Sequence, residues 1–152
     1  MQIANIEFCA PDDIDELYAV ECACFDSPWK RYILQNDLEE LGASIYLKAV
    51  LNGVIAGYGV LSRSDIESHL QNLAVLSGYR RQGIASQLVL GFEGISEDWG
   101  CKRMRLEVRS SNYAARDFYS KIGFVYLHRE KNYYVDGEDA LILTAKLPLS
   151  IK

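Results

Sequence analysis

The sequence lacks the features that mark several large protein classes. No apolar run approaches the roughly 18 residues needed to cross a membrane, and no internal repeat or low-complexity tract is visible. The start, residues 1–5, lacks a basic stretch followed by an apolar one, so we expect no signal peptide and a cytoplasmic location. With 152 residues, 49% of them hydrophobic, the chain fits one globular domain over 1–152.

Clustered metal ligands are also scarce. The cysteines are Cys9, Cys22, Cys24 and Cys101. Only Cys22 and Cys24 are close, and one intervening residue does not match the usual zinc spacings. The two histidines, His69 and His128, have no cysteine cluster nearby. We therefore expect reduced thiols and no metal.

An excess of positive charge is missing as well. The 16 Lys and Arg against 21 Asp and Glu give a net charge of −5. This disfavours direct nucleic-acid binding, which depends on neutralising phosphates. It is compatible with a cationic partner, such as an amine or a basic peptide.

Hydrophobic periodicity predicts eleven elements in the order β-α-α-β-β-β-α-β-α-β-β. The expected strands cover about 3–8, 45–51, 54–61, 68–75, 103–109, 124–129 and 140–147, and the expected helices about 11–25, 27–41, 83–97 and 112–121. This order predicts a mixed α/β (α+β) sheet of about seven strands, flanked by four helices, with one β-α-β crossover at its centre.

Several local signals support these boundaries. Asn52-Gly53 is a strong hairpin signal. Ser27-Pro28 suits a helix start, and Gly42 suits its end. Glu21 falls on the otherwise apolar face of the first expected helix. It could hydrogen-bond the following loop or contact a substrate, and we favour the structural role.

The turn from Arg80 to Ala85 has the properties of a phosphate cradle. It lies between the strand ending at 75 and the helix after Gly83, and helix N-termini bind phosphate through free N–H groups. Gly83 and the small Ala85 let the backbone approach a diphosphate. Arg80 and Arg81 can add charge-assisted contacts.

The motif alone leaves two interpretations open. It lacks the third small residue of a dinucleotide fingerprint and the Gly-Lys-Ser or Gly-Lys-Thr of a Walker loop. A helix start with small residues that merely packs close to the sheet is an equally good interpretation of these six residues.

The wider sequence resembles a known family. Residues 80–85 resemble the R/Q-x-x-G-x-G/A motif of the GNAT acetyltransferase superfamily, and the element order matches that fold. The blocks L-E-V-R-S-S-N at 106–112 and F-Y-S-K-I-G-F at 118–124 resemble the bacterial ribosomal-protein-alanine N-acetyltransferase (RimI) type. The segments F-D-S-P-W at 25–29 and K-N-Y-Y at 131–134 are similar to its two substrate-side segments. The resemblance covers nearly the whole chain.

The resemblance implies an acetyl-CoA site and names its residues. The expected cofactor-binding residues are Leu73, Ala74, Val75, Arg80, Arg81, Gln82, Gly83, Ile84, Ala85, Ser86 and Asn112, the first three through their backbone beside the pantetheine arm. Asn112 suits a helix cap equally well. The sequence departs from the family pattern at two places. Residues 76–79 replace a short turn that contains Asp-Pro, which affects the shape of the cradle entry. Asp26-Ser27 lengthens the spacing between Phe25 and Pro28, which affects the peptide preference.

The resemblance also implies catalytic roles. Glu107 is the expected general base, acting through an ordered water, and Tyr119 the expected acid that protonates the leaving thiolate. From the residues alone, Glu107 could instead be a surface glutamate paired with Arg105 and Arg109. Either Tyr119 or its neighbour Phe118 is expected to be pure core.

The acceptor is expected to be a protein N-terminus. Neutralising a lysine at pH 7 costs about 4–5 kcal/mol, whereas an α-amine costs about 1 kcal/mol, so one modest base is enough for the latter. Aromatic and proline side chains that could wall a peptide slot are Phe25, Pro28, Trp29, Tyr133 and Tyr134. The resemblance implies the N-terminal alanine of a basic small-subunit ribosomal protein as target, and we favour a monomer. A small amine, such as a polyamine or an aminoglycoside, and a non-catalytic acyl-CoA-binding module stay open as alternatives.

Overall fold

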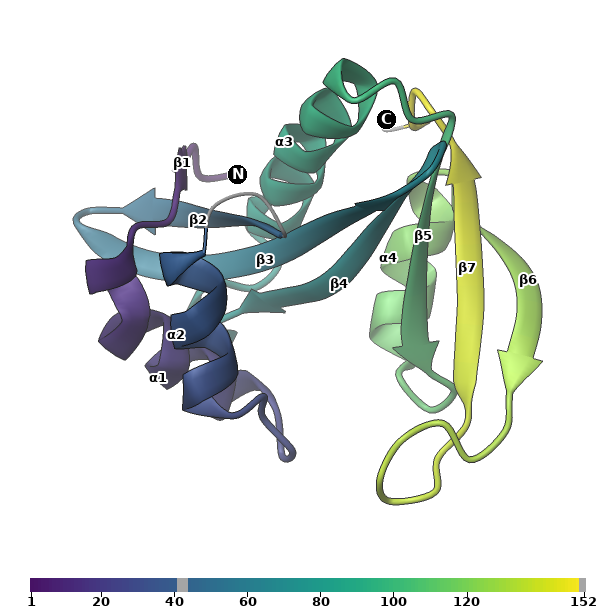
Figure 1. Cartoon of the computed structure of the whole chain (residues 1–152), viewed down its shortest axis with the longest axis horizontal. Helices are drawn as coiled ribbons and strands as arrows, with labels where there is room; N and C mark the ends of the chain where they lie inside the picture. Colours follow the sequence, from purple (N-terminus) through teal and green to yellow (C-terminus); the bar gives the residue numbers. More distant parts are fainter. Residues whose placement is uncertain (41–43, 151–152) are drawn as a thin grey trace. The chain divides into compact units, whose positions relative to one another are not determined.

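The structure is a computed structural model that describes residues 1–40 and 44–150. Its strands are β1 (Asn5–Phe8), β2 (Ile45–Leu51), β3 (Val54–Ser64), β4 (Glu67–Val75), β5 (Arg103–Arg109), β6 (Val125–Glu130) and β7 (Ala140–Lys146). Its helices are α1 (Ile14–Cys24), α2 (Arg31–Glu39), α3 (Ile84–Asp98) and α4 (Tyr113–Lys121), with 3-10 turns η1 (Pro11–Asp13) and η2 (Ser77–Tyr79) (Figure 1). The predicted order of strands and α-helices is confirmed.

The strands form a mixed seven-stranded sheet in the order β1-β2-β3-β4-β5-β7-β6. Strands β4 and β5 pair in parallel, with Leu70 opposite Leu106, and α3 is the crossover between them. The pairs β1–β2, β2–β3, β5–β7 and β6–β7 are antiparallel. At the hairpin joining β2 and β3, Asn52 and Gly53 have φ angles of 52° and 76°, as the predicted two-residue turn requires.

The chain divides into two compact units. The first unit comprises Met1–Ser62 and Gln71–Phe92, and the second comprises Arg63–Leu70 and Glu93–Lys152. Strands β3 and β4 and helix α3 each contribute residues to both units.

In the first unit, helices pack on both faces of the strands. Leu17 of α1, Leu34 of α2 and Tyr58 of β3 belong to one buried cluster. On the other face α3 comes so close that a Cβ on Gly59 would lie 2.6 Å from Cε2 of Phe92. The absence of a side chain at this position of β3 therefore permits the close packing of α3.

In the second unit, β5 alternates between a buried and a polar face. Met104, Leu106 and Val108 are buried on one face of β5. The intervening residues, which include Glu107, occupy the opposite face. This alternation follows the sequence pattern.

One predicted helix boundary is wrong. A helix start at Ser27-Pro28 is not observed, because α2 begins at Arg31 after Lys30 in extended conformation. The N–H of Trp29 donates instead to the side chain of Glu21 (2.9 Å), which holds this segment as a loop. The predicted end near Leu41, with Gly42 as its stop, lies outside the described residues.

Candidate active site

The predicted phosphate cradle lies in the first unit, at the start of α3. The N–H of Gln87 donates to the carbonyl of Gly83 (3.2 Å), so Gly83 caps the helix. Because first-turn N–H groups have no intrahelical acceptor, those of Ile84, Ala85 and Ser86 are directed out of the helix end. Such an end attracts anions.

Two residues of the cradle adopt left-handed backbone conformations. Gly83 has φ of 84° and Arg81 has φ of 61°. For a non-glycine residue this conformation costs roughly 1–2 kcal/mol. A Cβ at position 83 would also lie 3.2 Å from Cγ of Met1. The cradle thus has a conformation that glycine supports at position 83, and it stores strain at Arg81.

Arg80 is fixed at the end of strand β4. Its Nε donates to the carbonyl of Val75 (3.0 Å), which also accepts from Sγ of Cys24 (3.4 Å). This bond uses one of the five guanidinium donors. With Arg80 and Arg81 both exposed beside a helix N-terminus, the chemistry of this turn fits a diphosphate.

The other predicted cofactor residues flank this turn or lie in the second unit. Leu73, Ala74 and Val75 form the last part of β4, and Gln82 precedes the capping glycine. Asn112, in the second unit, caps α4 by accepting from the N–H of Ala115 (3.1 Å). The cap interpretation of Asn112 is therefore confirmed.

Glu107 lies on β5 in the second unit and is the centre of a hydrogen-bonded group. The Nε2 of His69 lies 2.7 Å and 2.9 Å from its two carboxylate oxygens. The hydroxyl of Tyr133 donates to Oε1 (3.0 Å). Because an ionised carboxylate only accepts hydrogen bonds, the proton of the imidazole contact belongs to Nε2.

The alternative pairing of Glu107 with neighbouring arginines is not observed. Arg109 bonds to Asp136 (2.9 Å) and Glu138 (3.0 Å), and Nε of Arg105 lies 3.5 Å from Oε1 of Glu67. Glu107 is thus held by an imidazole and a phenol rather than by a guanidinium.

This environment lowers the pKa of Glu107. Burial, the largest single effect, raises the pKa of the carboxyl, but the hydrogen bonds and charge of His69, the hydrogen bond from Tyr133 and the charge of Arg105 together outweigh it. The carboxyl is therefore ionised at neutral pH and can accept a proton. A low pKa also makes it a weak base.

Tyr119 is buried in the second unit, with 8% of its surface exposed. Its ring packs edge-on against Phe118 (5.1 Å between centroids) and Phe124 (5.4 Å). Burial raises the pKa of Tyr119, with a further contribution from Tyr134. The phenol therefore carries its proton at neutral pH, as a proton donor must.

The predicted acceptor residues fall into two groups. Phe25, Pro28 and Trp29 follow α1 in the first unit, and Phe25 is 36% exposed. Tyr133 and Tyr134 lie in the loop before β7 in the second unit, edge-on at 5.0 Å. The guanidinium of Arg109 lies 4.0 Å above the ring of Tyr134 and holds that ring in place.

His69 is the site residue that sequence reasoning missed. It lies on β4, opposite Arg105 of β5 in the parallel register. The sequence did contain an indication of this contact. The predicted parallel crossover places the strand before the cradle helix, which carries His69, next to the strand that carries Glu107. A single histidine between Ser68 and Leu70 could not be ranked from its sequence neighbours, however, since the register was unknown.

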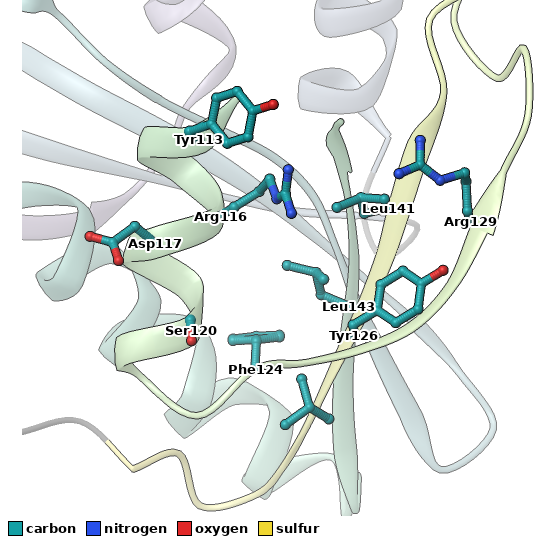
Figure 2. A pocket seen from close by; sticks show the side chains of 10 residues that line it. Tyr113, Arg116, Asp117, Ser120, Phe124, Tyr126, Arg129, Leu141 and Leu143 are labelled. Carbon is teal, nitrogen blue, oxygen red and sulfur yellow. The ribbon is translucent and has the colours of Figure 1, made fainter. Parts of the chain in front are cut away.

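A second feature of the second unit is a hollow of about 830 Å³ between α4, β6 and β7. Figure 2 shows Arg116 of α4 and Tyr126 of β6 on its walls, with Leu141 and Leu143 of β7 beneath them. Because Leu143 pairs with Leu106 and Ile142 pairs with Glu107, the hollow and Glu107 are on opposite faces of the sheet. Glu107 is therefore not part of the lining of this hollow.

Within residues 1–40 and 44–150, no group of three or more His, Cys, Asp or Glu side chains is placed to hold a metal ion. In the same part of the chain, none of the helices has the length and apolar character to cross a membrane.

Comparisons with known proteins agree with this geometry. The model of the acetyltransferase (GNAT) family matches residues 14–124. A ribosomal protein bS18-alanine N-acetyltransferase of Haemophilus influenzae is 33% identical over 87% of this chain and 86% of its own length. An N-alpha-acetyltransferase of Saccharolobus solfataricus is 32% identical over 90% of this chain and 89% of its own.

A solved structure has the same fold. The ribosomal-protein-S18-alanine N-acetyltransferase of Escherichia coli superposes with a TM-score of 0.85, at 28% identity, over 95% of this chain and 94% of that one. The family match and these relatives together show that the chain belongs to the GNAT family and is an acetyl-CoA-dependent N-acetyltransferase.

Proposed function

We propose that this enzyme acetylates the α-amino group of a protein N-terminus, and that its target is the N-terminal alanine of a basic small-subunit ribosomal protein. The observation that carries the choice of an α-amine is the environment of Glu107, whose pKa is lowered by His69 and Tyr133. The names of the bacterial relatives support the ribosomal target.

A weak base suits an acceptor that loses its proton easily. An α-amino group has a reference pKa near 8, against about 10.4 for lysine, so at pH 7 the α-amine costs about 3 kcal/mol less to neutralise. A carboxylate with a lowered pKa cannot compensate for the larger cost. The hydrogen bonds to Glu107 therefore favour an N-terminus over a lysine side chain.

Each residue has a defined task in this proposal. Acetyl-CoA supplies an acetyl thioester, whose transfer to the amine forms an amide and releases the thiol of CoA. Residues 73–75 and 80–86 hold the pantetheine arm and the diphosphate. Glu107 accepts the amine proton through one water, and Tyr119 gives its proton to the departing sulfur. Asn112 contributes to cofactor binding beside its role as a cap.

Five aromatic and proline side chains are proposed to bind the peptide. They are Phe25, Pro28 and Trp29 of the first unit, and Tyr133 and Tyr134 of the second. The net charge of −5 suits a basic protein substrate. We further propose that residues 1–152 act as one domain, because the family match from 14 to 124 includes residues of both units. A cytoplasmic location and a monomeric state are part of the same proposal.

A small amine is the second candidate acceptor. The acidic charge of the chain also suits a polyamine or an aminoglycoside. The third alternative, an acyl-CoA-binding module without activity, is disfavoured because the chain has both an ionised carboxylate at Glu107 and a protonated phenol at Tyr119.

A competition assay tests the proposal. The protein is incubated with acetyl-CoA and either an alanine-starting basic peptide or spermidine, and CoA release is measured. We expect turnover of the peptide, and its loss when the peptide N-terminus is blocked. Glu107→Gln should lower turnover at least about 100-fold with unchanged acetyl-CoA affinity, whereas Glu67→Gln on the neighbouring strand should not. Turnover of spermidine alone would disprove the N-terminal assignment.

A further inference from the structure

Glu21 is a buried carboxylate outside the proposed catalytic group. It lies in the last turn of α1 and is 1% exposed. Its Oε1 accepts from the hydroxyl of Tyr58 (2.5 Å) and from Nδ2 of Asn72 (2.8 Å). Its Oε2 accepts from the backbone N–H of Trp29 (2.9 Å). All four residues belong to the first unit.

The three donors are a phenol, a carboxamide and a peptide N–H, all of them neutral. Burying a carboxylate among neutral groups is unfavourable compared with burying an apolar side chain of similar volume. Stability alone therefore favours an apolar residue at position 21. What the carboxylate provides, and an apolar side chain would not, is hydrogen bonds that connect separate segments of the chain.

The proposed function assigns one of those segments to the acceptor and the other to the cofactor. Trp29 belongs to the loop of residues 25–30, which we call the acceptor segment. Asn72 immediately precedes Leu73 on β4, where the pantetheine arm is proposed to bind. Tyr58 of β3 also accepts from Nδ2 of Asn72 (3.0 Å), which closes the network on the strand side. A single carboxylate thus ties the acceptor segment to the cofactor strand.

We propose that Glu21 is a positioning residue that fixes the acceptor segment against β4 and thereby sets the affinity for the peptide acceptor. This proposal rests on the proposed function, because it takes residues 25–29 as a wall of the peptide site. The carboxylate touches neither the peptide nor the cofactor and acts through the backbone of Trp29.

The two oxygens of Glu21 have different partners, so one substitution can separate them. In Glu21→Gln the remaining oxygen can keep the two donors from Tyr58 and Asn72. The new amide group then faces the N–H of Trp29, and two donors oppose each other. The variant should release the acceptor segment while leaving the strand side of the network in place.

Steady-state kinetics with the alanine-starting peptide are the first test. We expect Glu21→Gln to raise the peptide KM about tenfold, the scale of losing a hydrogen bond to a charged group, with the acetyl-CoA KM within about twofold of the parent. Tyr58→Phe is the matched control, because it removes one donor from Oε1 but leaves the contact with Trp29. Its peptide KM should stay near the parent value even if its melting temperature falls.

Fluorescence supplies a readout that does not depend on activity. The chain has two tryptophans, so the Trp99→Phe background leaves Trp29 as the single indole reporter. In that background, Glu21→Gln should increase acrylamide quenching of Trp29, and Tyr58→Phe should not.

The outcomes separate the two proposals. Equal peptide KM changes in Glu21→Gln and Tyr58→Phe, or unchanged quenching in Glu21→Gln, would overturn the role of Glu21. Increased quenching together with an unchanged KM for every acceptor also overturns it, since the segment would then move without affecting binding. If spermidine is the only acceptor turned over, the proposed function fails, and quenching still reports whether Glu21 holds the segment.

Discussion

The Nε2 of His69 lies 2.7 Å from Oε2 of Glu107, so neighbouring parallel strands share an ionisable pair. Burial raises the pKa of the proposed base, and this contact, together with the hydroxyl of Tyr133, acts to lower it. It also ties the pH dependence of catalysis to a residue outside the family motif that first drew attention to Glu107.

Removing His69 should raise the pKa of Glu107. Burial raises that pKa and the imidazole lowers it, so His69→Ala leaves burial less opposed. The acidic limb of kcat/KM against pH, which reports the free enzyme, should move to higher pH. His69→Gln keeps a neutral donor and should move it less. A limb that stays in place in both variants would contradict the assignment of Glu107 as the base.

The same pair should contribute to stability in a defined pH window. Because the folded pKa of Glu107 is lowered, its contribution is complete above the ordinary carboxyl pKa and is lost as pH falls through the folded value. Thermal melts of the parent and Glu107→Gln should therefore differ more at pH 7 than at pH 3. An equal difference in melting temperature between the two proteins at pH 7 and at pH 3 would contradict this coupling of stability to the pKa of Glu107.

Tyr119→Phe should lose turnover without losing the fold. The phenol is buried against Phe118 and Phe124, and phenylalanine preserves both ring contacts. We expect turnover to fall about 100-fold, the lower end for a lost proton donor, with little change in acetyl-CoA affinity. Tyr126→Phe, on exposed β6, is the control. Equal rates for parent and Tyr119→Phe would leave the tyrosine with a packing role alone.

Two glycines of the segment between β4 and α3, Gly83 of the cradle and Gly78 of η2, offer a matched test of the cradle. Gly83→Ala forces a left-handed alanine, which costs roughly 1–2 kcal/mol, and places a Cβ 3.2 Å from Cγ of Met1. Gly78→Ala meets nothing within 4 Å. Calorimetric titration with acetyl-CoA should show binding about tenfold weaker for Gly83→Ala and unchanged for Gly78→Ala. Equal affinities would remove Gly83 from the cofactor site.

Asn112 can be tested for both of its roles. Asn112→Ala should lower the free energy of unfolding by about 1 kcal/mol, because the cap of α4 is lost. Asn112→Ser keeps a capping oxygen and should retain most of the stability. If Asn112→Ser has the stability of the parent but binds acetyl-CoA as weakly as Asn112→Ala, Asn112 contacts the cofactor. Full recovery of both quantities would assign it to the cap alone.

The order of elements could be predicted because the local signals agree with one another. Asn52-Gly53 predicted a two-residue hairpin turn, and both residues have the positive φ angles of that turn. The alternation along residues 103–109 predicted a strand with one buried face, as observed in β5. The helix start at Ser27-Pro28 failed because a cap is a local signal, and the N–H of Trp29 is bonded by a carboxylate eight residues earlier. A prediction from the residues around Ser27 and Pro28 does not include this hydrogen bond to Glu21.

The site was only partly predictable for the same reason. Glu107 and Tyr119 were predicted through a resemblance, not through the chemistry of their neighbours, and their catalytic roles stay a prediction. The partners of Glu107 lie 38 and 26 residues away, at His69 and Tyr133, and only the strand register and the following loop bring them to it. Contacts of that separation depend on tertiary structure.

Strand β4 carries residues of both hydrogen-bonded networks, His69 for Glu107 and Asn72 for Glu21, only three positions apart. Neighbouring side chains on a strand alternate between faces, so inserting or deleting one residue between them would reverse the face of one side chain relative to the other. Substitutions can remove either network separately. A change of length in this short stretch would disconnect at least one of them, and we therefore expect β4 to tolerate exchange of residues far better than any change in their number.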